Sequence, residues 1–263
     1  MNPTAVITGA SSGIGEEFAR QLAAQGCDLL LVARREQLLA NLKTEIEAKH
    51  SVAVETIVCD LADPQQVRNL EERIEQIDHL EFMVNNAGFG REGTYPDVDP
   101  DQEAEMIQVH VIALVRLARA ALIPMCRRKK GFLINLASVA SFLHGTNVAQ
   151  YMATKAYVLS FSKSVNCDVA RHGVRVQALC PGLTRTGFHD TATMKSDVVA
   201  KTPGIAWLSA EYVVRCSLKT LRRRWHSVVC IPSLRYKFVL WLLCNPLGEW
   251  FTETMYAYRA RKK

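Results

Sequence analysis

Short apolar runs alternate with longer amphipathic stretches along most of this 263-residue chain. The apolar runs have the length and composition of buried parallel strands and lie at Ala5–Ile7, Leu29–Val32, Val52–Val58, Phe82–Val84, Phe132–Leu136, Val174–Leu179 and Val228–Ile231. Between them, apolar residues recur with helical spacing in Ile14–Gln25, Glu36–Lys49, Pro64–Gln76, Gln102–Arg127 and Ala149–Arg171. This alternation predicts βαβ units, whose right-handed crossovers build one parallel sheet with helices on both faces. We therefore predict a doubly wound α/β fold in a single domain.

Two stretches depart from the alternation. Thr184–Gly204 is a long polar insertion after the sixth predicted strand, and a loop of that length in a compact domain is usually functional or mobile. After Pro232 the chain continues apolar and basic although the alternation has ended. We assign residues 1–232 to the α/β domain and residues 233–263 to an extension of the same domain.

A glycine-rich segment follows the first predicted strand and opens the first predicted helix. It reads Thr8-Gly9-Ala10-Ser11-Ser12-Gly13-Ile14-Gly15. Glycines allow a tight turn and a close approach to a pyrophosphate, and the helix N-terminus offers free N–H groups to the anion. The strand before and the helix after favour a Rossmann-like dinucleotide site over a plain strand-to-helix turn.

The end of the second predicted strand is where such a fold normally reads the ribose of the cofactor. This chain has Arg34 and Arg35 there, and the nearest acid, Glu36, follows them. Guanidinium groups bind a phosphate in a bidentate manner, whereas a carboxylate would repel it. The charge predicts NADP(H) in preference to NAD(H). The alternative is that both arginines merely begin a solvated helix.

A tyrosine and a lysine, Tyr151 and Lys155, are four residues apart in a predicted helix and therefore share one face. An ammonium beside a phenol favours the phenolate and is expected to lower the pKa of Tyr151 toward working pH, as a general acid or base requires. Tyr-x-x-x-Lys alone is common by chance. Ser138, however, ends the fifth predicted strand, where α/β sheets place ligand-binding groups.

The order of these motifs resembles the short-chain dehydrogenase/reductase family. The glycine segment, Asn85-Asn86-Ala87-Gly88, Ser138, Tyr151-x-x-x-Lys155 and Pro181-Gly182 follow one another at plausible spacing from about Thr4 to Phe188. The resemblance implies an oxidoreductase that interconverts a carbonyl and an alcohol with a nicotinamide cofactor. It also implies a dimer or tetramer formed through Gln102–Arg127 and Ala149–Arg171.

The resemblance further implies a role for each matched residue. Tyr151 exchanges the proton with the substrate, Lys155 lowers its pKa and binds the nicotinamide ribose, and Ser138 orients the substrate oxygen. The other implied cofactor contacts are Asp60 and Leu61 near the adenine, Asn86, Ala87 and Gly88 beside the cofactor, and Pro181, Gly182, Thr184 and Thr186 at the carboxamide of the nicotinamide.

One position departs from the family pattern. The family usually has an asparagine in the helix after the fourth strand, whereas this chain has Val109-His110-Val111. The asparagine's backbone carbonyl is thought to hold a water in a proton relay, and a backbone carbonyl survives a side-chain change. Two interpretations stay open: His110 joins the relay and alters the pH profile, or it is a packed histidine that the helix tolerates.

Composition and charge limit the setting and the partners. The eight cysteines stand singly, without a CxxC pair. We therefore expect neither a zinc cluster nor any other metal site, and we expect a reducing, cytoplasmic compartment. No signal peptide is recognisable near Met1. The net charge is +6, and residues 222–263 hold nine Lys/Arg and two Glu, a net +7 that leaves −1 for the rest.

The apolar run Phe238–Cys244 is too short to span a bilayer, for which about 20 residues are needed. It either lies on a membrane face or over an apolar substrate, or it packs as an ordinary helix. Its character favours an apolar ketone or a 3-oxoacyl compound as substrate. Arg222-Arg223-Arg224 is a solvated helix end rather than a nucleic-acid site. The alternative function is a non-catalytic NADP(H)-binding sensor or scaffold.

Overall fold

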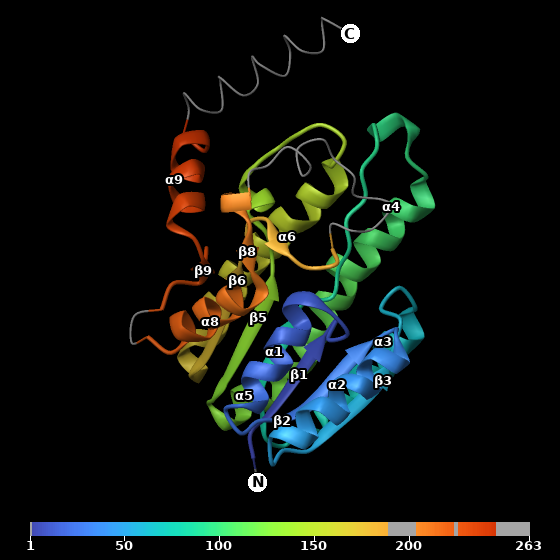
Figure 1. The fold of residues 1–263 in the computed structure, drawn as a ribbon, viewed down its shortest axis with the longest axis vertical. Coiled ribbons are helices and arrows are strands. Elements are labelled where there is room, and N and C mark those ends of the chain that lie inside the picture. The colour runs from blue at the N-terminus through green and yellow to red at the C-terminus, as the bar shows by residue number, and fades with distance from the viewer. Residues whose placement is uncertain (1, 189–203, 224–225, 246–263) are drawn as a thin grey trace, which may run out of the picture.

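Seven parallel strands form the central sheet, in the order β3-β2-β1-β4-β5-β6-β9 (Figure 1). The computed structural model describes residues 2–188, 204–223 and 226–245. The strands are β1 (Thr4–Thr8), β2 (Asp28–Ala33), β3 (Val54–Val58), β4 (Leu80–Asn85), β5 (Gly131–Leu136), β6 (Val174–Leu179) and β9 (Val229–Cys230). All seven predicted strands are present, although β3 begins two residues later than predicted and β9 is only two residues long. A separate parallel pair joins β7 (Thr184–Arg185) to β8 (Leu208–Ser209).

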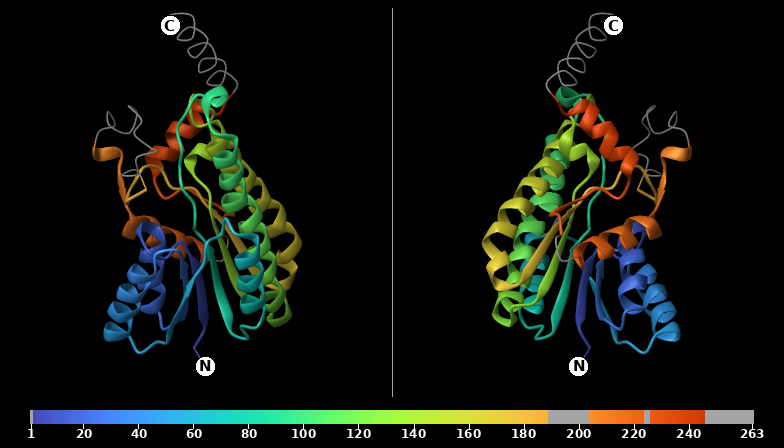
Figure 2. Two further views of the ribbon diagram at one scale, coloured as in Figure 1. Left: turned by 90° about the vertical axis from the view of Figure 1, so that its right-hand side faces the viewer. Right: turned by 90° about the vertical axis from the view of Figure 1, so that its left-hand side faces the viewer.

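Helices cover both faces of the sheet, as predicted (Figure 2). One face carries α1 (Gly13–Ala23), α2 (Glu36–Lys49) and α8 (Ala210–Leu221), whose apolar sides share a core with β1 and β2. The other carries α3 (Pro64–Glu75), α5 (Leu114–Arg128) and α6 (Ala149–Val169). Local signals explain where α3 begins: Pro64 occupies its first turn, and the Asp63 carboxylate accepts the Gln65 N–H at 2.7 Å. One sheet covered on both sides confirms the doubly wound single domain.

The predicted helix Gln102–Arg127 is three consecutive segments. They are α4 (Pro100–Ile107), a π-helical stretch over Gln108–Ala113, and α5. Pro100–Arg128 as a whole is long and apolar enough to cross a membrane, but half of its most apolar window is buried and α5 packs on β4, β5 and α3. A π-helical stretch interrupts the regular hydrogen bonding and often marks a functional site. This one contains His110.

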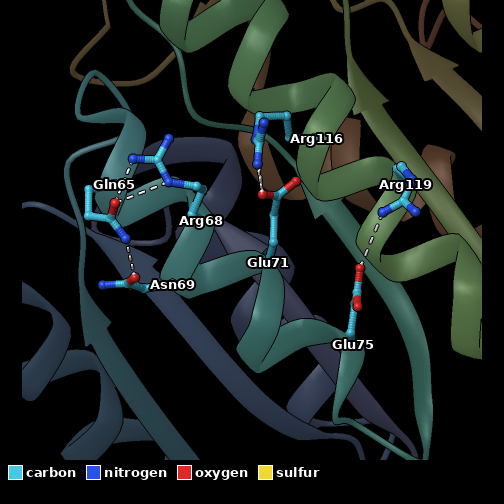
Figure 3. Close-up of polar contacts among 7 residues, drawn as sticks. All are labelled: Gln65, Arg68, Asn69, Glu71, Glu75, Arg116 and Arg119. Atoms are coloured by element: carbon cyan, nitrogen blue, oxygen red, sulfur yellow. Dashed lines mark hydrogen bonds and ion pairs between the residues drawn. The ribbon is translucent and has the colours of Figure 1, made fainter.

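Two ion pairs join α3 to α5 on the outer surface (Figure 3). Glu71 pairs with Arg116, and Glu75 accepts from Arg119 at 3.4 Å. The Glu75–Arg119 pair is exposed and contributes at most about 1 kcal/mol, whereas the Glu71 side chain is only 13% exposed. Beneath both pairs, α3 and α5 share one apolar core.

The order of the strands reverses beside β1, since β2 and β3 lie on one side of it and β4, β5, β6 and β9 lie on the other. Two neighbouring loops leave the carboxyl ends of β1 and β4 in opposite directions at that point. In open α/β sheets, ligands bind at such a switch point. The glycine segment and Asn86-Ala87-Gly88 are these two loops.

The C-terminal part holds α8, β9 and α9 (Leu234–Leu243), of which β9 was predicted as a strand, α9 was one of two alternatives for the tail, and α8 was not predicted. The run Phe238–Cys244 falls largely on α9, at the carboxyl end of the sheet (Figure 1). Most of the Thr184–Gly204 insertion and the end of the tail fall in residues 189–203 and 246–263, outside the described residues.

Candidate active site

The loop between β1 and α1 is shaped to accept a ligand against its backbone. Gly9 and Gly13 have φ values of +65° and +62°, which other residues rarely adopt. A Cβ on Gly15 would lie 2.3 Å from the Gly9 carbonyl oxygen, so the turn closes only without a side chain. Because α1 begins at Gly13, its free N–H groups and positive dipole end meet the loop. The loop fits a pyrophosphate.

Hydrogen bonds hold the glycine loop against the loop after β4. The Thr8 hydroxyl accepts the backbone N–H groups of Asn86, at 3.0 Å, and Ala87, at 3.1 Å. The Asn86 amide donates to the carbonyl oxygens of Thr8, at 2.9 Å, and Gly9, at 3.2 Å. Thr8 and Asn86 therefore hold the two loops next to each other. Both were predicted to bind the cofactor, and these hydrogen bonds give them a structural role that does not require contact with it.

The two arginines after β2 have different surroundings. The Arg35 guanidinium donates to the hydroxyls of Ser11, at 2.9 Å, and Ser12, at 2.7 Å, and so lies over the glycine loop. Arg34 instead faces the Asp60 carboxylate at 3.8 Å, and both side chains are exposed. A guanidinium next to two hydroxyls presents several donors to one oxyanion. Of the two arginines, Arg35 is therefore the one placed to bind a phosphate at the glycine loop.

The strand-end residues on the adenine side are Asp60 and Leu61. The Asp60 carboxylate accepts the Ala62 N–H at 3.0 Å and shapes the turn before α3. The Leu61 side chain is buried in the core with Val32 and Val67, so it is not available for a side-chain contact with the cofactor.

Ser138, Tyr151 and Lys155 come together at the carboxyl end of β5. Ser138 begins a 3₁₀ turn (Val139–Phe142), and its hydroxyl accepts the Ala140 N–H at 3.1 Å and lies near the Tyr151 phenol, whose pKa it lowers. The Lys155 ammonium is buried, donates to the Leu136 carbonyl oxygen at 2.9 Å, and lies 5.8 Å from the centre of the Tyr151 ring. A proton-donating phenol thus lies beside a hydroxyl that can share the same substrate oxygen.

Burial controls the protonation of both ionisable groups. It raises the pKa of Tyr151 above its ordinary value of 10, and the hydrogen bond with Ser138 only partly opposes this. Burial also lowers the pKa of Lys155 to about 8. The expected lowering of the Tyr151 pKa by Lys155 is therefore wrong for this arrangement, because the ammonium donates to Leu136 instead of the phenol. Burial therefore favours the protonated form of the Tyr151 phenol.

His110 is buried, and both of its ring nitrogens have partners. Nε2 accepts the Phe89 N–H at 2.9 Å, and Nδ1 lies 3.1 Å from the Thr154 hydroxyl. That hydroxyl donates to the Tyr151 carbonyl oxygen at 2.8 Å, so Nδ1 carries the proton of a neutral imidazole. Burial and the charge of Lys155 hold the His110 pKa well below 6.5. These contacts favour the packed-histidine interpretation over a group that titrates near neutrality.

Replacing His110 with alanine is expected to destabilise the protein by about 2–4 kcal/mol, since it opens a cavity and leaves the partly buried Phe89 N–H without its acceptor. Urea unfolding measures the loss. His110→Asn, which keeps a polar side chain, is the matched control and should lose less while keeping the pH profile of the wild-type activity. Equal stability of His110→Ala and wild type would contradict the structural role.

The loop after β6 closes the remaining side of the site. The Pro181 carbonyl oxygen accepts the Val139 N–H at 3.0 Å, and the Thr184 hydroxyl donates to the Gly182 carbonyl oxygen at 2.9 Å. Thr186 lies against the glycine loop, where a Cβ on Gly13 would come within 2.9 Å of it. Gly88 lies over the catalytic end, where a Cβ would come 3.0 Å from His110 Nε2 and 3.5 Å from Lys155 Nζ.

Tyr236, on α9, is a positioning residue that the sequence pattern did not indicate. Its hydroxyl accepts the Leu183 N–H and donates to the Ala206 carbonyl oxygen, each at 3.0 Å. Its ring occupies the space in front of Gly182, where a Cβ would lie 2.1 Å from it. Tyr236 is 53 residues from Leu183 in the sequence, and no local signal connects the two.

A family model of the short chain dehydrogenases matches residues 3–197. The chain belongs to the short-chain dehydrogenase/reductase family. It is 35% identical over 185 residues to a fatty acyl-CoA reductase of Acinetobacter baylyi, a match that covers 69% of this chain and 62% of that protein. Its fold is similar to a short-chain dehydrogenase from Sphingobium yanoikuyae in complex with NADPH, with a TM-score of 0.82, 32% identity and coverage of 90% and 92% of the two chains. It also resembles a bulky-bulky ketone specific alcohol dehydrogenase from Comamonas testosteroni, with a TM-score of 0.78, 27% identity and coverage of 99% and 93%.

This short-chain dehydrogenase/reductase is thus an oxidoreductase. The predicted catalytic and cofactor-binding residues all lie inside the matched residues 3–197, whereas α8, β9 and α9 lie beyond them. Among the described residues, no group of three or more histidine, cysteine or acidic side chains is placed to hold a metal ion.

Proposed function

We propose that this chain is an NADP(H)-dependent oxidoreductase that interconverts a carbonyl and an alcohol on a hydrophobic substrate, with Tyr151 as general acid or base. One observation carries the proposal: Tyr151 lies near Ser138 and beside a buried Lys155 at the carboxyl end of β5, the edge of the sheet that also holds the glycine loop. The names of the similar proteins, a fatty acyl-CoA reductase and a dehydrogenase for bulky ketones, support an apolar carbonyl substrate.

The residues of the site divide the proposed work. The glycine loop and the α1 N-terminus would hold the pyrophosphate, Arg35 with Ser11 and Ser12 the 2′-phosphate, and Lys155 the ribose hydroxyls. When bound, the reduced nicotinamide supplies the hydride. Tyr151 gives its phenolic proton to the carbonyl oxygen, which Ser138 orients by a hydrogen bond.

The direction we propose is reduction. Reduction uses Tyr151 in its protonated form, which burial of the phenol favours, and a preference for NADPH would supply the reductant. The test is NADPH oxidation by the purified protein against a panel of apolar ketones and 3-oxoacyl compounds. Binding of NADPH without turnover on any carbonyl or alcohol would support the sensor alternative instead.

We expect NADPH affinity to fall as the pH rises above about 8. Lys155, with a pKa of about 8, carries a charge that attracts the anionic cofactor below this pH and loses it above. The sign follows from the lowered pKa: the protonated form is the binding form, so affinity decreases by up to about tenfold per pH unit above the pKa. Fluorescence titration of NADPH between about pH 7 and pH 9.5 measures the slope. A Lys155→Met protein should show no slope in this window, and a slope equal to that of wild type would contradict the assignment.

We also propose that the protein assembles through α5 and α6. An apolar surface depression between them is lined by Val115, Arg119, Leu122, Ile123, Cys126, Phe161 and Val165. Tyr157, stacked on Phe161 at 6.1 Å between ring centres, extends this surface and is exposed. An exposed apolar area is typical of an interface.

A Leu122→Asp protein is therefore expected to run as a monomer, since a carboxylate buried between two copies costs several kcal/mol. Light scattering after size exclusion measures the mass. Leu38→Asp, on the exposed side of α2, is the control and should keep the wild-type mass. A monomeric wild type would contradict the proposed assembly.

The proposed compartment is the cytoplasm. All eight cysteines lie within the described residues and are free thiols, as is typical of proteins in a reducing compartment.

A further inference from the structure

Helix α9 exposes an unusual amount of apolar surface. Leu234 is 80% exposed, Trp241 69% and Phe238 62%, and Val239 and Leu242 are also exposed. These five residues, called the α9 surface below, occupy half of a ten-residue helix. Phe238 and Trp241 stack on each other, with ring centres 6.0 Å apart, and so present one continuous aromatic patch. Scattered apolar residues on a surface are ordinary, but a concentration on one helix marks an interaction site.

The opposite side of α9 is held firmly to the rim of the active site. Leu240 is buried, and Tyr236 bridges Leu183 and Ala206 through its hydroxyl. At the end of the helix, the Cys244 thiol donates to the Phe142 carbonyl oxygen at 3.2 Å. Phe142 belongs to the turn that Ser138 begins, and Leu183 follows the Pro181-Gly182 loop. The α9 surface is thus attached to both loops that flank the catalytic residues.

The basic residues of α9 indicate which kind of partner its apolar surface would bind. The helix contains Arg235 and Lys237, and residues 226–245 contain no acidic residue. A two-fold contact between two such surfaces would bring the cations of one copy against those of the other, which costs free energy. An anionic lipid surface complements both properties, because acyl chains accept the apolar side chains and head groups attract the lysine and arginine. Exposed tryptophan is also favoured at the boundary between water and lipid.

We propose that the α9 surface docks on a bilayer that contains anionic lipids, with Phe238 and Trp241 inserted at the interface and Lys237 among the head groups. Docking brings the active-site rim to the membrane, since α9 is attached to the loops after β5 and β6. This consequence rests on the proposed function: an apolar carbonyl compound dissolved in the bilayer would reach Tyr151 without crossing water. The docking itself does not depend on catalysis.

The experiment is co-sedimentation of the full chain with vesicles of phosphatidylglycerol and phosphatidylcholine, compared with vesicles of phosphatidylcholine alone. We expect binding to the anionic vesicles that weakens as salt is added. Phe238→Ser with Trp241→Ser should reduce the affinity roughly 10- to 100-fold, and Lys237→Glu should reduce it by a smaller factor. Tyr95→Ser with Leu38→Ser removes two exposed apolar side chains elsewhere and should leave binding unchanged.

Separate readouts distinguish the possible outcomes. Retained NADPH binding by the α9 variants shows that they are folded, and a Tyr151→Phe protein should bind vesicles as the wild type does, so docking and catalysis are tested independently. Absence of binding to anionic vesicles, or equal binding by the Phe238→Ser, Trp241→Ser protein, would overturn the proposal. So would a loss of oligomeric mass in that variant without vesicle binding in the wild type, because the α9 surface would then be a contact between copies.

Discussion

A Tyr151→Phe enzyme is expected to bind NADPH as tightly as the wild type and to reduce carbonyl substrates about 10²- to 10⁴-fold more slowly. The substitution removes the only atom by which this side chain gives up a proton and keeps the ring in its place in α6. The loss should appear in kcat, because the phenol acts on the reacting oxygen in the transition state. Steady-state NADPH oxidation and a separate cofactor titration measure the two quantities.

Tyr157→Phe is the matched control for this experiment. Tyr157 lies on the same helix, is exposed, and stacks on Phe161 away from Ser138, so its variant should keep the full rate. Wild-type turnover in Tyr151→Phe would exclude Tyr151 as the acid. If neither protein turns over any carbonyl although both bind NADPH, the site is a cofactor sensor and not an enzyme.

An Arg35→Ser enzyme is expected to lose about 10- to 100-fold in affinity for NADPH while its affinity for NADH stays the same. The guanidinium lies over Ser11 and Ser12 at the glycine loop, where a 2′-phosphate would meet three donor groups. NADH has no phosphate at that position, so removal of the arginine costs it nothing. Titration with both nucleotides gives the ratio of the two dissociation constants.

Arg34→Ser provides the comparison, since Arg34 faces Asp60 across 3.8 Å instead of lying over the loop. We expect a smaller loss of NADPH affinity in this variant than in Arg35→Ser. If Arg34→Ser has the larger effect, the phosphate lies on the Asp60 side of the loop and the assignment to Arg35 is wrong. Equal affinity of the wild type for NADPH and NADH would contradict the cofactor preference itself.

Periodicity was sufficient for most of the sheet, because buried parallel strands must be apolar throughout. Val174–Leu179 matches β6 residue for residue. It failed at Val52–Val58, where the strand begins only at Val54, and at Gln102–Arg127, where a π-helical stretch surrounds His110. A π-helical turn holds an extra residue, and whether one forms depends on how the helix packs against its neighbours. The spacing of apolar residues in the sequence does not reveal it.

The sequence by itself determined the doubly wound class, the glycine loop, and the gathering of Ser138, Tyr151 and Lys155. These follow from local rules: strand ends meet at one edge of a parallel sheet, and residues four apart share a helix face. Only the tertiary structure decided that Arg35 lies over Ser11, that Lys155 donates to Leu136, and that Tyr236 holds the loop after β6. Each of these is a contact between segments that are distant in the sequence. The geometry and burial of the contact decide where the side chain lies and whether it is charged. For Tyr151, burial in the fold reversed the direction of the pKa shift that the neighbouring lysine had predicted.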